Sequence, residues 1–294
     1  MGSIEDMIKK AIDLHFHVEP DILPRKYNAF SLAKSQVGKI GKICIKSHTF
    51  PTVDWAKIVN DKIGKKFLIG SITLNNFVGG MNEDVIYAAT KIFKSPFVVW
   101  FPTIHAENFL KRSKEEFRKE WTNDPTFVPR KSKEVKPVRI IENGKLRKEV
   151  INVLRAIREF NCILATGHIS WKESKKVVEE AIKIGVRKII ITHPIYQLID
   201  MPINIQKELA KKGAFIEHCY SMYSIDKISF DKVVKQIKAI GHENCILSSD
   251  TGQPFSPDSN EALKEFTFRL IKKGISEDEI EMMIIENPTR LISE

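Results

Sequence analysis

The segment AIDLHFH, residues 11–17, is a short apolar run that ends in two histidines. Seven later segments repeat this arrangement of an apolar run with a polar end, and longer amphipathic stretches lie between them. They are KICIKSH (42–48), FLIGSITLN (67–75), PFVVWFPT (96–103), NCILATGH (161–168), KIIITHP (188–194), GAFIEHC (213–219) and NCILSSD (244–250). Eight short strands that alternate with helices predict an α/β fold, the parallel (β/α)8 TIM barrel.

Helical patterns occupy the intervals between these segments. Ser170 with Glu173, and Ser276 with Glu279, fit the capping box, in which each side chain satisfies a free backbone N–H at a helix start. The interval 105–159 is too long for the regular alternation, so we predict a long insertion after strand 4 that lies over the site as a lid or substrate loop. Apolar residues recur at helical spacing in 83–93, 174–184, 205–212, 231–240 and 261–273.

The length and composition favour one domain, residues 1–294. A chain of 294 residues with 43% hydrophobic residues can bury the core of a single barrel. No apolar stretch is long enough to span a membrane, and the N-terminal sequence lacks a signal-peptide cleavage pattern, so we expect a cytoplasmic protein without a membrane partner. The four cysteines have no CxxC spacing and are expected to be buried thiols.

The net charge of +10 does not by itself predict a nucleic-acid partner. Acidic and basic residues are interspersed on predicted helix faces, as in KESKKVVEEAIKIGVRK (172–188), which is typical of solvated helix surface. The densest basic stretch, 129–139, contains no aromatic residues that could stack on bases. We therefore expect a small-molecule substrate rather than nucleic acid, and the sequence does not predict the oligomeric state.

Two histidines on the first predicted strand form the strongest local signal for chemistry. His15 and His17 are two residues apart, so their side chains leave the same face of a strand roughly 7 Å apart along the chain. Both imidazoles can then bind a single ion beside the barrel axis. His-x-His also occurs by chance, so the interpretation depends on the other polar residues.

Three further polar side chains end predicted strands five, six and eight: His168, His193 and Asp250. The C-terminal ends of the strands are where barrels of this kind carry their chemistry. Alternation also predicts that Leu164 and Thr166 share a side with His168, as Ile189 and Ile191 do with His193, and Ile246 and Ser248 with Asp250. These nitrogen and oxygen donors suit a divalent metal, with zinc favoured and manganese, iron, nickel or cobalt as alternatives.

The DLHFH opening, the strand-terminal His168 and His193, Asp250 after ILSS and the final ENPTRLI segment resemble the amidohydrolase superfamily, in particular an uncharacterised barrel family within it. This resemblance implies that His15, His17 and His168 are metal ligands. It implies that His193 is a second-metal ligand or a hydrogen-bond donor to the attacking water. Asp250 would contact the metal and accept the proton of that water. The implied activity is hydrolysis of an amide, ester, lactone or related bond in a small, possibly anionic substrate.

One departure from the superfamily pattern bears on the number of metal ions. Binuclear members usually have a bridging carboxylated lysine or a glutamate on strand four, and FVVWFPTIH (97–105) has neither. We therefore expect one ion, with two as the alternative. Lys46 at the end of strand two could be carboxylated and bridge a second metal, could bind a substrate carboxylate or phosphate as a cation, or could reach solvent. We favour the role of substrate cation.

Further candidates for contact with substrate are His48, His105 and His218. Glu217 and His218 point to opposite sides of strand seven, and alternation does not decide which of them faces the barrel. Three other functions stay open: a metal-dependent decarboxylase or other lyase, a phosphoesterase, and a barrel that binds a metal or ligand without catalysis. The phosphoesterase ranks lowest, because the additional ligands of its trinuclear site are not evident in the sequence.

Overall fold

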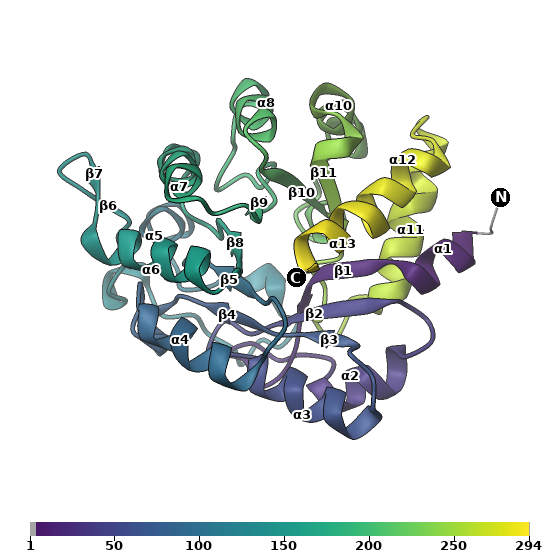
Figure 1. The fold of residues 1–294 in the computed structure, drawn as a ribbon, viewed down its shortest axis with the longest axis horizontal. Coiled ribbons are helices and arrows are strands. Elements are labelled where there is room, and N and C mark those ends of the chain that lie inside the picture. The colour runs from purple at the N-terminus through teal and green to yellow at the C-terminus, as the bar shows by residue number, and fades with distance from the viewer. Residues whose placement is uncertain (1–3, 294) are drawn as a thin grey trace.

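The computed structural model describes residues 4–293, and these residues form a (β/α)8 barrel (Figure 1). Each predicted strand is present, which confirms the predicted fold. Across residues 4–293 the eight barrel strands are β1 (Ile12–His17), β2 (Lys42–Lys46), β3 (Leu68–Ile69) with its continuation β4 (Ser71–Thr73), β5 (Val98–Trp100), β8 (Ile163–Ala165), β9 (Ile189–Ile191), β10 (Phe215–Cys219) and β11 (Cys245–Ser248).

The barrel strands pair in parallel and close on themselves. Strands β1, β2 and β3 form one sheet, and β4, β5, β8, β9, β10 and β11 follow in that order in the other. Gly70 separates β3 from β4, and a Cβ atom there would lie 2.6 Å from Val53 Cα, so no larger residue fits. On the other side, His17 N–H donates to Thr251 O at 2.8 Å and Asp250 N–H donates to His15 O at 2.7 Å. These bonds join the segment after β11 to β1.

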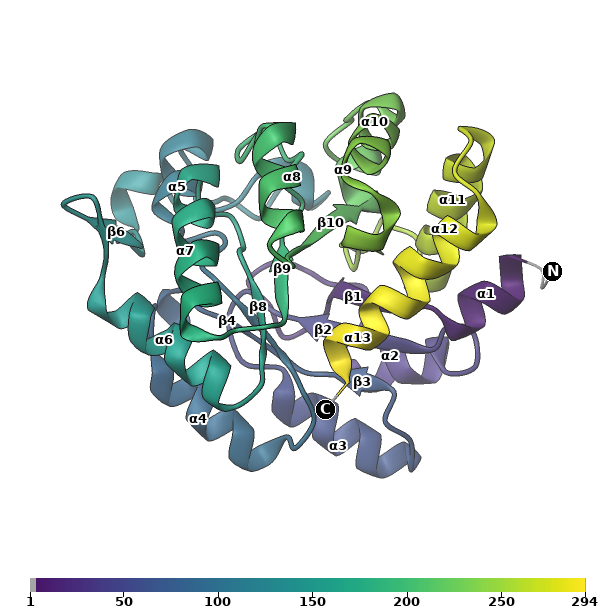
Figure 2. The same ribbon diagram turned by 45° about the horizontal axis from the view of Figure 1, so that its top comes forward.

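Helices surround the strands (Figures 1 and 2). The five predicted helices are confirmed with ends shifted by at most a few residues, and both predicted capping boxes are present at Ser170 and Ser276. The bounds are α1 (Ile4–Lys10), α2 (Ala29–Gln36), α3 (Val53–Ile63), α4 (Glu83–Ile92), α6 (Lys148–Glu159), α7 (Trp171–Ile184), α8 (Ile203–Lys211), α9 (Tyr220–Ser224), α10 (Phe230–Ile240), α11 (Ser259–Lys272), α12 (Glu277–Glu281) and α13 (Asn287–Ile292). No helix within residues 4–293 combines the length and apolarity that a membrane crossing requires.

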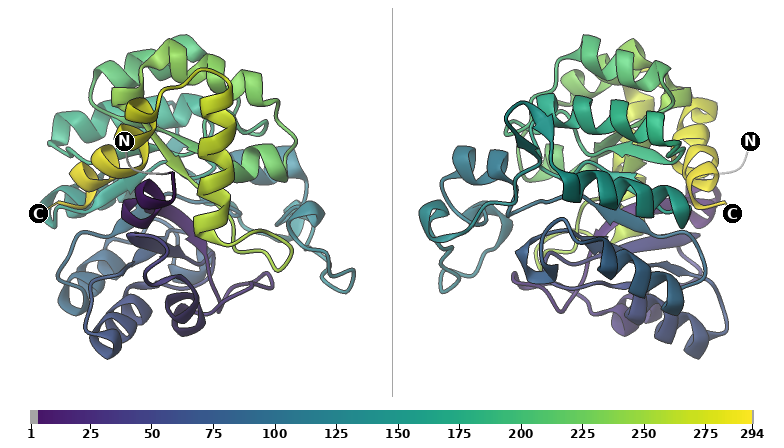
Figure 3. Two further views of the ribbon diagram at one scale, coloured as in Figure 1. Left: turned by 90° about the vertical axis from the view of Figure 1, so that its right-hand side faces the viewer. Right: turned by 60° about the vertical axis from the view of Figure 1, so that its left-hand side comes forward.

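The predicted insertion follows β5 and extends from one end of the barrel (Figure 3). It contains α5 (Glu107–Ser113), short 3-10 turns at Lys119–Trp121 and Ser132–Glu134, and a hairpin of β6 (Ile141–Glu142) and β7 (Lys145–Leu146). His105 and Arg130 both contact the Glu116 carboxylate, which ties the two sides of the insertion together. The insertion is therefore attached to the barrel end by buried polar contacts.

The barrel interior has an apolar lower part. We call this cluster the lower layer; it consists of Ile12, Leu14, Cys44, Ile69, Val98, Trp100, Ile163, Ala165, Ile190, Ile246 and Leu291. A larger apolar cluster includes the residues that pack between strands and helices. The four cysteines are buried and free, as predicted. Apolar packing thus fills one end of the interior and leaves the other end to polar side chains.

Candidate metal centre

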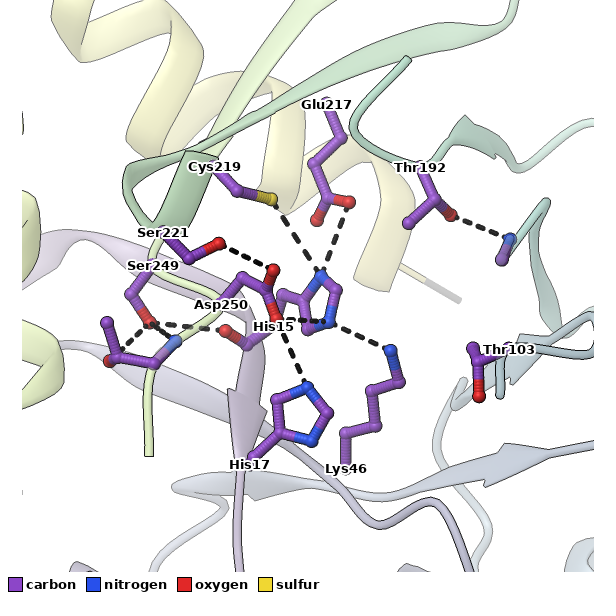
Figure 4. A network of polar contacts seen from close by, with 12 residues as sticks. His15, His17, Lys46, Thr103, Thr192, Glu217, Cys219, Ser221, Ser249 and Asp250 are labelled. Atoms are coloured by element: carbon purple, nitrogen blue, oxygen red, sulfur yellow. Dashed lines mark hydrogen bonds and ion pairs between the residues drawn. The ribbon is translucent and has the colours of Figure 1, made fainter. Parts of the chain in front are cut away.

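Two histidines of β1 and one aspartate after β11 meet at the carboxyl ends of the strands (Figure 4). His15 Nε2 lies 3.0 Å from Asp250 Oδ1, and His17 Nε2 lies 3.1 Å from the same oxygen. The three donor atoms are all within 4.8 Å of one another. The spacing of the two histidines and the position of Asp250 thus bring together three of the predicted ligands.

A β-bulge in β1 aims His15 at this cluster. Asp13 pairs with Ile43 and Phe16 pairs with Ile45, so β1 has one more residue than β2 over the same interval. Because of the extra residue, Leu14 joins the lower layer while His15, the next residue, also contacts groups inside the barrel. The Asp13 carboxylate accepts from the His15 and Ser249 backbone N–H groups and so satisfies donors around the bulge.

Glu217 lies behind the His15 ring. Its Oε2 is 3.4 Å from His15 Nδ1, which resolves the alternation on β10: Glu217 faces the barrel interior. A carboxylate at one ring nitrogen orients an imidazole and makes the other nitrogen a better metal ligand. Burial disfavours the charged ring, but Asp250 and Glu217 outweigh burial and raise the pKa of His15.

His17 has two neighbours at its other ring nitrogen. The Arg25 guanidinium lies 3.1 Å from Nδ1, and Asp21 Oδ2 lies 3.8 Å from the same atom. When Nδ1 accepts from Arg25, Nε2 carries the proton and donates to Asp250; when Nδ1–H points to Asp21, Nε2 is free to bind a metal. Burial and Arg25 lower the pKa of His17 to about 4, so the ring is neutral in either form near neutral pH.

Lys46 is fully buried and points to the same cluster. Its Nζ lies 2.9 Å from His15 Nε2 and 4.3 Å from the centre of the Trp100 ring. The alternative in which this lysine reaches solvent is therefore wrong, because a fully buried side chain cannot be hydrated. Burial lowers the pKa of Lys46, and the nearby Asp250 and Glu217 carboxylates partly offset that shift.

His168 and His193 lie close to the cluster but form no hydrogen bond with His15, His17 or Asp250. Their ring centres are 5.1 Å apart, and the His193 ring is 5.9 Å from the His15 ring. Among residues 4–293, neither Nδ1 atom has a hydrogen-bond partner although both are buried. Burial lowers the pKa of His168 well below its usual value and that of His193 to about 4. Two neutral imidazoles are thus available as additional ligands or hydrogen-bonding groups.

The predicted substrate histidines differ in position. His48 lines the pocket, and its Nδ1 is 3.0 Å from Thr103 Oγ1. His105 does not reach the pocket, because Nδ1 accepts from Asn76 N–H at 3.0 Å and Nε2 contacts Glu116 at 2.9 Å. His218 is on the face of β10 opposite to Glu217, away from the cluster. The predictions for His105 and His218 are therefore not supported. The His105 ring lies between Asn76 and Glu116, and the buried His218 side chain points away from the barrel interior.

A pocket of about 390 Å³, part of it open to solvent, lies against the cluster. The insertion contributes Trp121, whose ring stacks at 13° and 6.2 Å on that of His48. No sequence motif marks Trp121, Tyr196, Ser221 or Asp226, which lie in loops and short helical turns. The lining residues are His17, Arg25, His48, Trp121, His168, His193, Tyr196, Ser221, Met222, Ile225, Asp226, Asp250 and Gln253.

The donor set fits one divalent metal ion. Two imidazole nitrogens and one carboxylate oxygen converge within 4.8 Å, and two more imidazoles with unpartnered nitrogens are close by. The fourth barrel strand, β5, directs Trp100 to the interior, where it contacts His15 at a ring distance of 4.4 Å. An indole cannot bridge two metal ions, so β5 supplies no bridging ligand.

Solved structures share this barrel. A probable dipeptidase, PvdM, from Pseudomonas aeruginosa is 12% identical with a TM-score of 0.63, and the match covers 98% of this chain and 96% of that chain. An amidohydrolase from Pseudomonas aeruginosa is 11% identical with a TM-score of 0.57, with 99% and 98% coverage. At these identities the likeness establishes the fold, and it confirms the predicted resemblance to the amidohydrolase superfamily at that level.

The barrel therefore has the same fold as these two solved structures. The chain belongs to a family of unknown function, DUF6282, whose profile matches residues 10–217. The matched region includes His15, His17, Lys46 and Glu217 and ends before Asp250. No curated protein matches the sequence significantly.

Proposed function

We propose that this protein is a metal-dependent hydrolase that acts on an amide, ester, lactone or related bond of a small molecule. The observation that carries the proposal is the convergence of His15, His17 and Asp250 at the wall of a partly open pocket. Zinc suits these ligands best. We favour one ion because β5 offers no side chain that could bridge two. His168 and His193 would complete the coordination or bind the attacking water.

A bound divalent ion would supply a Lewis acid that acidifies water and polarises a carbonyl group. Asp250 is the group that takes the proton. Its Oδ2 accepts a hydrogen bond from Ser221 Oγ at 2.6 Å, while Oδ1 contacts both histidines of β1. Burial would raise its pKa, but His15 and His17 outweigh burial and hold the pKa of Asp250 well below its usual value. Asp250 is therefore ionised and can act as a base near neutral pH.

Tyr196 is positioned to donate to the substrate. The residue is 1% exposed and lines the pocket, and its hydroxyl lies beside the Arg118 guanidinium. Burial raises its pKa above the usual value, and the Arg118 guanidinium only partly offsets that shift, so the phenol stays protonated. A protonated buried hydroxyl beside the reacting groups suits a carbonyl oxygen that gains negative charge.

The charges in the pocket favour a substrate without a large negative charge. Arg25 already binds the Asp21 carboxylate at 2.6 Å, and Arg118 binds Asp226 at 3.1 Å. Lys46 contacts His15 and does not line the pocket. The predicted role of Lys46 as a cation for the substrate therefore loses its support, and so does the anionic substrate that a decarboxylase requires. The pocket suits a small polar molecule that can contact the Trp121 ring.

The test is a substrate screen with metal-loaded protein. Wild type, D250N and D231N would be incubated with p-nitrophenyl esters, lactones and dipeptides, with metal content measured for each. D231N removes an exposed carboxylate outside the pocket and should match wild type. We expect hydrolysis by wild type and a loss of about 10³-fold or more in D250N with most of the metal retained. A fully active D250N would contradict the role of Asp250, and release of CO₂ without hydrolysis would favour the lyase.

A further inference from the structure

We propose that the Lys46 ammonium competes with the metal ion for His15, so that this lysine stands in for the ion in the metal-free protein and weakens metal binding. The inference rests on the proposed metal centre and adds a role for a residue that the proposed hydrolysis does not use. It replaces the role of substrate cation that the sequence suggested for Lys46.

The geometry places Lys46 at the same ring nitrogen that a metal would use. Lys46 pairs with His17 across β1 and β2, and its Nζ lies 2.9 Å from His15 Nε2. Asp250 Oδ1 lies 3.0 Å from that nitrogen (Figure 4). When His15 Nδ1–H points to Glu217, Nε2 keeps a lone pair, which either accepts from the Lys46 ammonium or binds a metal ion. A metal ion at His15 therefore has to displace the Lys46 contact.

The charges around Lys46 explain why a cation is held there. Asp250 and Glu217 both attract its ammonium, and the side chain has no contact with solvent. Two buried carboxylates near one imidazole need positive charge nearby, which either a lysine or a divalent ion can supply. Lys46 thus stabilises the arrangement of His15, Glu217 and Asp250 before metal binds.

Trp100 gives the displaced ammonium a place to remain. The Lys46 Nζ is 4.3 Å from the centre of its ring, within the range of a cation–π interaction. Trp100 is fully buried in the lower layer and its ring contacts that of His15. Lys46 can therefore give up His15 and keep a favourable contact inside the barrel, where its charge still repels a divalent ion.

Calorimetric titration of the metal-stripped protein with Zn²⁺ tests this competition. K46M keeps an unbranched side chain without the charge, and K42M removes a partly buried lysine from the other end of β2 as a matched control. We expect K46M to bind Zn²⁺ with a Kd at least about tenfold lower than wild type, because a nearby positive charge is removed. K42M should bind as wild type does.

The other outcomes separate the alternatives. Weaker binding by K46M would overturn the inference and make Lys46 a ligand or a bridging carbamate, the latter if bicarbonate strengthens binding by wild type. An unchanged Kd would also overturn it, since Lys46 would then not compete. If K46M does not fold, as judged by circular dichroism, K46Q replaces it with the same expectation. Failure of wild type and folded variants alike to bind Zn²⁺ would instead contradict the proposed metal centre.

Discussion

The two layers of the barrel interior are built by the same strands from opposite kinds of side chain. The lower layer is apolar throughout, with Leu14, Trp100 and Ile246 among its members. The upper layer holds His15, Lys46, Glu217 and Asp250, all buried and each in contact with another charged or titratable group. On β1 a single bulge separates the two layers. The contrast indicates that the lower layer stabilises the barrel, and we propose that the upper layer carries the chemistry.

The largest expected effect comes from the upper layer. His15→Ala removes the nitrogen that contacts Asp250 and Lys46, so metal affinity should fall by more than the 10- to 100-fold typical of losing an outer contact. Metal content after gel filtration and titration with Zn²⁺ measure the loss. If His15→Ala bound Zn²⁺ with wild-type affinity, the proposal that the upper layer holds the metal would be wrong.

The next effect comes from the adjacent residue in the lower layer. Leu14 is fully buried, and Leu14→Ala should lower the free energy of unfolding by about 2–5 kcal/mol through lost apolar contacts and a residual cavity. Denaturant titration measures this change. Metal content per chain should stay as in wild type under native conditions. Loss of metal from a folded L14A protein would show that the two layers are not separable.

A smaller effect is expected where the insertion meets the barrel. The Asp226 side chain is 3% exposed and contacts Arg118 of the insertion at 3.1 Å. Burial raises its pKa from 3.8 to about 7, against the effect of Arg118. The folded state therefore binds the proton more tightly, so the stabilisation is complete below about pH 4 and is lost as the pH rises through 7.

Asp226→Asn should remove this dependence. Between pH 4 and pH 7.5, wild type should lose about 2 kcal/mol of stability relative to the variant, within the limit of about 4 kcal/mol that the pKa shift allows. Thermal melts at matched ionic strength measure the stability of wild type and D226N at each pH. The surface variant D231N serves as the control for the general pH dependence. If the stability of wild type and of D226N changed equally with pH, burial would not raise the pKa of Asp226 in the folded protein, and this prediction would be wrong.

Much of the fold could be predicted because each strand combines an apolar run with a polar end. The eight strands, the five helices, both capping boxes and the position of the insertion follow from local patterns of this kind. The place of Asp250 at the end of this strand was predictable as well, since Ile246 is in the lower layer, but the direction of its side chain depends also on the chain turn at Asp250, where φ is 50°.

Alternation failed for the other two strand-terminal histidines. Leu164, Ile189 and Ile191 pack in the cluster shared with the helices, whereas Ala165 and Ile190 face the interior. His168 and His193 nevertheless reach the pocket, because the chain turns after each strand with a φ of 61° at Gly167 and 21° at His193. A strand pattern contains no information about such turns.

The remaining site residues come from contacts that are distant in sequence. Trp121, Tyr196 and Asp226 belong to three different loops, and only the closed barrel and its insertion bring them to one pocket. The orientation of Glu217 depends on the packing of β10 between β9 and β11, which alternation alone leaves undetermined. The bulge at His15 depends likewise on Asp13 and Ser249, which are 236 positions apart.

The central claim is that the upper layer binds one divalent metal ion. Elemental analysis of the purified protein, before and after chelation and reconstitution, tests it most directly. We predict about one ion per chain, removed by chelation, restored by Zn²⁺ and absent from the His15→Ala variant. A wild-type protein that holds no ion even after reconstitution would contradict the claim, and the cluster of His15, Lys46, Glu217 and Asp250 would then be a metal-free ion-pair network.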